Sequence, residues 1–199
     1  MDRQARYVVV MGVSGSGKTE IARRVATETN CPWLDADDHH PANNVEHMRR
    51  GQPLNDEMRW PWLEAVSRAA QAKADQCPPG NTANTIFIAC SALKRSYRDV
   101  LGRNLDPVTF VFLDGTRDVI KSRLERRVGH FMPSALLDSQ LADLETPGPD
   151  ENCVTVFVDA PIDAVVSTVI TRLKNCENGS SSFVKDNITG KTVCQGEER

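Results

Sequence analysis

The sequence lacks the features of a membrane protein or a nucleic-acid-binding protein. No apolar run approaches the roughly 20 residues that a membrane-spanning helix needs, and no signal peptide precedes the first apolar stretch, residues 7–11. Lysine and arginine number 24 against 27 acidic residues, so no basic excess favours a polynucleotide partner. We therefore expect a cytoplasmic protein with no membrane or nucleic-acid partner.

Metal and redox signatures are also missing. None of the six cysteines forms a C-x-x-C pair, so we expect reduced thiols rather than disulfides or a zinc site. The H-E-x-x-H pattern is absent too, which disfavours a transition metal held by the clustered histidines His39, His40 and His47.

The 199 residues suffice for one domain with its own core. Short apolar stretches predict strands at residues 7–11, 32–35, 85–90, 109–113 and 154–158. Helical spacing predicts helices at 20–29, 43–50, 62–74, 93–101, 118–127, 134–144 and 162–173, with Pro61 in the first turn of the third. This alternation predicts an α/β fold, a five-stranded parallel sheet with helices on both faces. From about residue 175 the chain is polar, and we expect 175–199 to be a flexible tail.

One glycine-rich stretch dominates the functional interpretation: Gly12-Val13-Ser14-Gly15-Ser16-Gly17-Lys18-Thr19. It satisfies G-x-x-x-x-G-K-[ST] between a predicted strand and a predicted helix, the context in which this pattern binds phosphates. Glycines let backbone N–H groups converge on phosphate oxygens, Lys18 can reach the β- and γ-phosphates, and the Thr19 hydroxyl can ligate Mg²⁺. The stretch therefore predicts ATP and Mg²⁺ as cofactors. No N-K-x-D motif is present, which argues against a switch GTPase.

An acidic cluster, Asp35-Ala36-Asp37-Asp38-His39-His40-Pro41, directly follows the second predicted strand. Parallel sheets bind ligands beyond the carboxyl ends of their strands. We predict Asp37 as the base that receives a hydroxyl proton and Asp35 as a Mg²⁺ ligand. His40 is either a substrate ligand or a loop residue with only local hydrogen bonds.

An arginine-rich stretch, residues 123–133, is the candidate lid, which we extend to about residue 140. Arg123 and Arg127 lie four residues apart on one helical face and can stabilise charge on the transferring phosphoryl group. The alternative is a solvated basic helix face.

Three further cationic residues are candidates for the site. Arg59 is placed to pair with an anionic substrate group. Lys94 and Arg98 are one helical turn apart, so the sequence predicts two cations on one face.

These motifs together resemble the gluconokinase family, small P-loop kinases related to shikimate and adenylate kinases. Beyond the P-loop and the acidic cluster, the matching stretches are Gly51-x-Pro53-Leu54-x-Asp56, Arg59-x-Pro61-Trp62-Leu63, Cys90-Ser91-Ala92-Leu93-Lys94, Tyr97-Arg98-Asp99, Gly129-His130-Phe131-Met132-Pro133, Ser139-Gln140 and Leu144-Glu145. The resemblance implies that residues 1–174 form a three-layer P-loop kinase domain with a mobile lid.

The resemblance also implies an activity: ATP-dependent phosphorylation of the 6-hydroxyl of D-gluconate, which yields 6-phospho-D-gluconate for the pentose phosphate pathway. One or more of four cationic candidates, which the sequence does not rank, would then hold the gluconate carboxylate: Arg59, Lys94, Arg98 and His130. A homodimer is possible. His39 and Met58 depart from the usual family pattern near the acceptor. The alternatives are a kinase for another small polyol acid, such as shikimate, and a nucleotide-binding module without catalysis.

Overall fold

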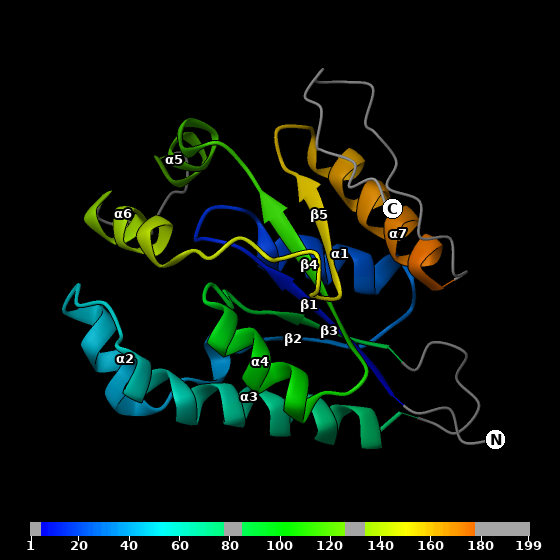
Figure 1. Cartoon of the computed structure of the whole chain (residues 1–199), viewed down its shortest axis with the longest axis horizontal. Helices are drawn as coiled ribbons and strands as arrows, with labels where there is room; N and C mark the ends of the chain where they lie inside the picture. Colours follow the sequence, from blue (N-terminus) through cyan, green and yellow to red (C-terminus); the bar gives the residue numbers. More distant parts are fainter. Residues whose placement is uncertain (1–4, 78–84, 126–133, 178–199) are drawn as a thin grey trace, which may run out of the picture.

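The computed structural model describes residues 5–77, 85–125 and 134–177 (Figure 1). Among these residues, no helix is both long and apolar enough to cross a membrane. Most of the expected tail and the middle of the expected lid lie outside the described residues. The last described helix extends through Glu177, beyond the predicted end at residue 173.

A parallel sheet of five strands forms the centre of the structure, as the sequence predicts. The strands are β1 (Arg6–Met11), β2 (Trp33–Asp35), β3 (Thr85–Ala89), β4 (Val108–Asp114) and β5 (Cys153–Phe157), in the order β2-β3-β1-β4-β5. The helices are α1 (Lys18–Glu28), the 3₁₀ helix η1 (Ala36–His39), α2 (Ala42–Arg49), α3 (Asp56–Asp75), α4 (Arg95–Asn104), α5 (Arg117–Glu125), α6 (Ser134–Asp143) and α7 (Ile162–Glu177). Because β1 is central, the loop that follows it lies at the middle of the carboxyl edge.

The central strand is buried on both faces, which explains its unbroken apolar sequence. Val8 and Val10 pack into one core with α1 and α7, whereas Val9 and Met11 pack into a second core with α3 and α4. Figure 1 shows α3 and α4 side by side on their face of the sheet. The expected arrangement, helices on both faces of one sheet, is therefore confirmed.

Helix α1 begins at Lys18, two residues before the predicted start, and the starts of α3 and α4 also differ from the sequence-based prediction. Helix α3 begins at Asp56 because the Asn55 side chain caps it, accepting a hydrogen bond from the Met58 amide at 2.9 Å. Pro61 therefore lies inside the helix rather than in its first turn. Helix α4 begins at Arg95, two residues later than predicted, after Ala92 adopts a left-handed φ of 43°.

Candidate active site

The P-loop, residues 12–19, is a tight turn with glycine at its bends. Gly12, Gly15 and Gly17 have φ values of 140°, 86° and 98°. A Cβ on Gly12 would lie 2.9 Å from the Leu113 carbonyl oxygen, so the loop packs directly against the end of β4. Helix α1 starts at Lys18, so the N-terminus of the helix directly follows the loop. This combination of converging amides and a helix N-terminus is a phosphate-binding arrangement.

Thr19 in the first turn of α1 and Asp35 at the end of β2 meet although β1, which precedes α1, and β2 are not neighbours in the sheet. The Thr19 hydroxyl donates to Asp35 Oδ2 at 2.7 Å. The other oxygen of Asp35 accepts from the Asp37 amide at 3.0 Å, which caps η1. A hydroxyl and a carboxylate are the hard oxygen donors that Mg²⁺ prefers. Among the described residues no group of three or more His, Cys, Asp or Glu could hold a metal ion. A Mg²⁺ bound to these two oxygen donors would therefore need phosphates and water as its other ligands.

Trp62 of α3 contacts η1, the 3₁₀ helix that carries Asp37, and the residue that follows η1. Trp62 donates from its indole N–H to the Ala36 carbonyl at 2.7 Å and stacks on His40 with ring centroids 4.3 Å apart. The exposed Asp37 carboxylate lies 3.9 Å from His40 Nε2. Burial, with the nearby Arg59 charge, lowers the pKa of His40 to about 4, so the imidazole is neutral at pH 7. His40 is therefore a neutral neighbour of Asp37. A contact between His40 and the substrate stays a prediction.

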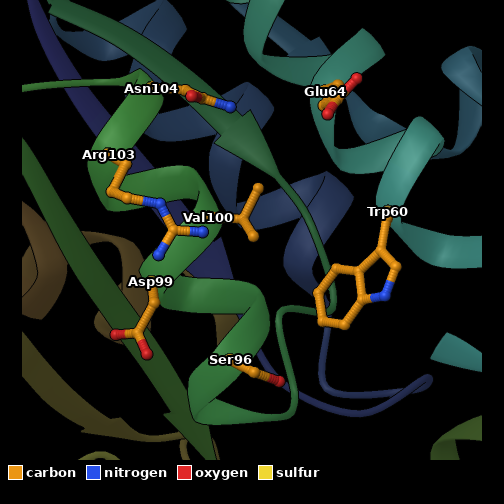
Figure 2. Close-up of a pocket in the computed structure, with 7 residues that line it drawn as sticks. All are labelled: Trp60, Glu64, Ser96, Asp99, Val100, Arg103 and Asn104. Carbon is orange, nitrogen blue, oxygen red and sulfur yellow. The ribbon is translucent and has the colours of Figure 1, made fainter. Parts of the chain in front are cut away.

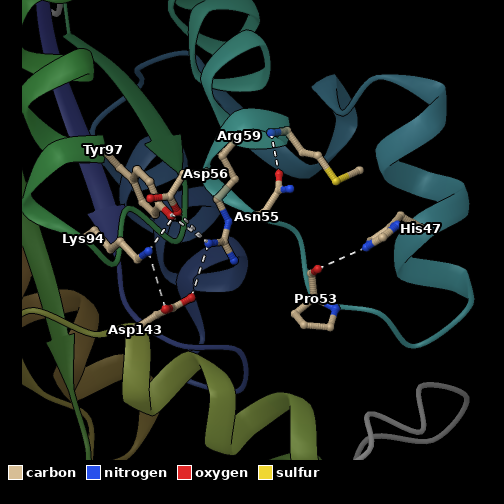
Figure 3. Close-up of polar contacts among 9 residues, drawn as sticks. His47, Pro53, Asn55, Asp56, Arg59, Lys94, Tyr97 and Asp143 are labelled. Carbon is tan, nitrogen blue, oxygen red and sulfur yellow. Dashed lines mark hydrogen bonds and ion pairs between the residues drawn. The ribbon is translucent and has the colours of Figure 1, made fainter.

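Two of the predicted acceptor cations, Arg59 and Lys94, come together in one network (Figure 3). Arg59 donates to the Tyr97 hydroxyl at 2.7 Å and to Asp143 Oδ2 at 3.3 Å. Lys94 Nζ lies 2.8 Å from Asp56 Oδ1 and 3.7 Å from Asp143 Oδ1. The Asp56 hydrogen bond raises the pKa of Lys94, and those from Lys94 and Tyr97 lower the pKa of Asp56, so both remain charged. We define these five residues as the acceptor network.

Side chains from α5 and α6 contact the P-loop directly. Arg123 donates to the Ser16 carbonyl at 3.2 Å and to the Val158 carbonyl at the end of β5. Gln140 accepts a hydrogen bond from the Ser14 amide at 2.7 Å. The two ends of the expected lid, at Arg123 and at Gln140, therefore both contact the phosphate-binding loop.

Known proteins similar to this chain identify its family. A family model described as an AAA domain matches residues 8–147. The thermoresistant gluconokinase of Escherichia coli (strain K12) is 43% identical over 167 residues, which cover 83% of this chain and 92% of that protein. The gluconokinase of Gluconobacter oxydans (strain 621H) is also 43% identical, over 85% of this chain and 92% of its own. The chain belongs to the gluconokinase family.

Solved structures lead to the same family. A sugar kinase from Janibacter sp. HTCC2649 is 44% identical with a TM-score of 0.77, and the match covers 90% of this chain and 100% of that one. A gluconokinase from Sinorhizobium meliloti 1021 is 38% identical with a TM-score of 0.74, over 90% and 99% of the two chains. The shikimate kinase of Aquifex aeolicus, at 16% identity and a TM-score of 0.55, shares the fold.

Arg98 does not join the other acceptor candidates. It is 2% exposed, and its guanidinium contacts both Glu151 oxygens, at 2.5 and 2.9 Å. It also donates to the Ala92 and Leu93 carbonyls, at 3.2 and 3.0 Å. The prediction that Lys94 and Arg98 share one face is wrong, because Lys94 precedes α4 and turns to other partners. Arg98 joins α4 to the loop before β5, and we remove it from the candidate site.

Two other predicted residues, Arg127 and His130, lie outside the described residues, so their roles stay predictions. Conversely, the sequence analysis assigned no site role to Asp56, Tyr97, Gln140 or Asp143. Asp56, Tyr97 and Gln140 fall in stretches shared with the gluconokinase family, which was a usable signal. Asp143 carried no signal, because only the fold brings the end of α6 to α3 and α4.

A separate pocket of about 490 Å³ lies between α3 and α4 (Figure 2). Its lining residues are Trp60, Glu64, Ser96, Asp99, Val100, Arg103 and Asn104. None of them belongs to the P-loop or to the acceptor network. This pocket is therefore separate from the residues that the sequence predicts to bind ATP and the acceptor.

The buried pair of Arg98 and Glu151 generates a stability prediction. Replacing Glu151 with glutamine leaves the buried guanidinium without a counterion, so the free energy of unfolding should fall by about 3 kcal/mol. Chemical denaturation measures this change. The control is Asp150→Asn, which breaks the neighbouring exposed pair with Arg95 and should leave stability nearly unchanged. Equal effects of the two changes would contradict the structural role of Arg98.

The lowered pKa of His40 generates a pH prediction. In the unfolded chain His40 binds a proton near pH 6.5, whereas in the folded protein it binds one only near pH 4. Because the unfolded state takes up this proton first, the wild type loses stability as the pH falls from 6.5 to 4. His40→Phe keeps a ring on Trp62 and removes this loss. Its unfolding free energy relative to wild type should rise on acidification, by at most about 3 kcal/mol. Urea unfolding at pH 7 and pH 4.5 tests this, and a pH-independent difference would refute it.

Proposed function

We propose that this chain is a gluconokinase that transfers the γ-phosphoryl group of ATP to the 6-hydroxyl of D-gluconate, giving 6-phospho-D-gluconate and ADP. The observation that carries the proposal is the acceptor network beside the P-loop, in a chain of this family. Its cations suit a carboxylate, and Gln140 and Asp143 show that one helix reaches both the network and the loop. A phosphate donor and an acidic sugar would therefore bind at one edge of the sheet.

The ATP half of the site is built by the P-loop. Its amides and Lys18 hold the β- and γ-phosphates, and Arg123 stabilises charge on the transferring group from its place against Ser16. Thr19 and Asp35 hold Mg²⁺, whose chemistry is to neutralise the phosphate oxygens. In this proposal the residues of the chain position the ATP phosphates and supply positive charge to the transferring phosphoryl group.

The acceptor half is built by Asp37, Arg59 and Lys94. The two cations hold the gluconate carboxylate, which directs the far end of the sugar acid toward the P-loop. Asp37, exposed at the same sheet edge, receives the proton of the 6-hydroxyl as the oxygen attacks phosphorus. The neutral imidazole of His40 leaves the negative charge on Asp37 uncancelled.

We also propose a cytoplasmic enzyme, because the five cysteines in the described part of the chain are free thiols. Homodimer formation stays a prediction.

A panel of acceptors tests the proposed function. With ATP and Mg²⁺, coupled ADP release should be strong with D-gluconate and absent with shikimate. Lys18→Ala should remain folded by circular dichroism and lose at least about 100-fold in kcat/KM, because a phosphate contact needed in the transition state is removed. Turnover of shikimate but not gluconate would reject the acceptor. ATP binding without transfer to any acceptor would favour a binding module.

The assignment of the base is tested at Asp37. Asp37→Asn should lower kcat about 100-fold and leave ATP affinity nearly unchanged, because a general base acts in the chemical step. The matched control is the neighbouring, exposed Asp38, for which Asp38→Asn should retain kcat. A loss confined to ATP affinity would place the base elsewhere.

A further inference from the structure

The inner face of α6 places two oxygen-bearing side chains on the candidate site. Gln140 and Asp143 lie three residues apart, on the same side of the helix. Gln140 accepts from the P-loop amide of Ser14, and Asp143 contacts Arg59 and Lys94 (Figure 3). These two contacts hold α6 across both halves of the site.

The charges of the acceptor network balance only when Asp143 is present. Arg59 and Lys94 are two cations, and Asp56 and Asp143 are two anions. The cationic side chains are 13% and 25% exposed, so water screens them poorly. A substrate carboxylate added to the complete network would place three anions against two cations. If it replaces one aspartate, the balance is restored.

Of the two aspartates, Asp143 is the one whose contacts with Arg59 and Lys94 a ligand can replace. Asp56 lies in the first turn of α3, where the helix dipole stabilises an anion, and accepts from Lys94 at 2.8 Å and Tyr97 at 2.5 Å. Asp143 is the last residue of α6, where the dipole disfavours an anion. Its contacts are longer, 3.3 Å to Arg59 and 3.7 Å to Lys94. Asp56 is therefore a fixed part of the site and Asp143 a weakly held one.

We infer that Arg59 and Lys94 form a subsite for a single carboxylate, and that Asp143 occupies this subsite until the acceptor displaces it. The inference rests on the proposed function, because it takes gluconate as the acceptor. Asp143 is thus an internal competitor of the substrate carboxylate.

The test is calorimetric titration of the full chain with D-gluconate, in wild type and in Asp143→Asn. Asparagine has nearly the same shape but no charge, so gluconate should bind about five-fold more tightly to the variant, the equivalent of one ion pair that no longer has to be broken. D-Glucitol keeps the other five hydroxyls and has a neutral CH₂OH group in place of the carboxylate, so its affinity should not change. The control is Asp138→Asn on the same helix, which loses an exposed pair with Arg117 and should bind gluconate as the wild type does.

Three results would overturn the inference. Weaker gluconate binding by Asp143→Asn would make Asp143 a direct ligand of the acceptor or a purely structural residue. Unchanged gluconate binding would place the carboxylate elsewhere, and equal tightening for D-glucitol would show that Asp143 blocks space rather than competes by charge. If wild type turns over gluconate, each of these results leaves the proposed function standing. If wild type neither binds nor phosphorylates gluconate, the proposed function fails and the inference fails with it.

Discussion

The close approach of the P-loop to the end of β4 is the constraint on which the site depends. Gly12 turns away from the central strand directly against the Leu113 carbonyl, where no side chain fits. That turn brings the N-terminus of α1 to the middle of the sheet edge. Because β1 is buried on both faces, the loop starts from a rigid base, and the polar groups that follow β2 and β3 converge on it.

Burial decides what each arginine does in this fold. Arg98 and Arg59 were equal candidates in the sequence, since both lie near the carboxyl edge. Arg98 is fully enclosed, and the Glu151 carboxylate with two backbone carbonyls satisfies its donors, so it has a structural role. Arg59 is 13% exposed and shares partners with Lys94, so its contacts can be exchanged for those of a ligand. Residue type alone does not separate these two roles.

The parts of the structure that are predictable from sequence are those with local causes. Short apolar stretches alternating with helices predicted the sheet, and the P-loop pattern predicted the turn after β1. The predicted start of α3 rested on Pro61 alone, whereas the Asn55 side chain caps the helix earlier in the chain, which is also a local signal. Asp143 could not be predicted, because its partners are 49 and 84 positions away in the sequence and meet it only through the packing of α6.

The two carboxylates of the acceptor network balance the charges of its two cations. Two cations held close together and poorly solvated repel each other, and this repulsion would lower the pKa of Lys94 if no anion were near. Asp56 and Asp143 prevent this, and the pKa of Lys94 is raised instead. A permanent second anion would, however, repel the substrate. An anion at the unfavourable end of a helix dipole resolves this conflict, because it compensates the charge while the site is empty and is the easier of the two to displace.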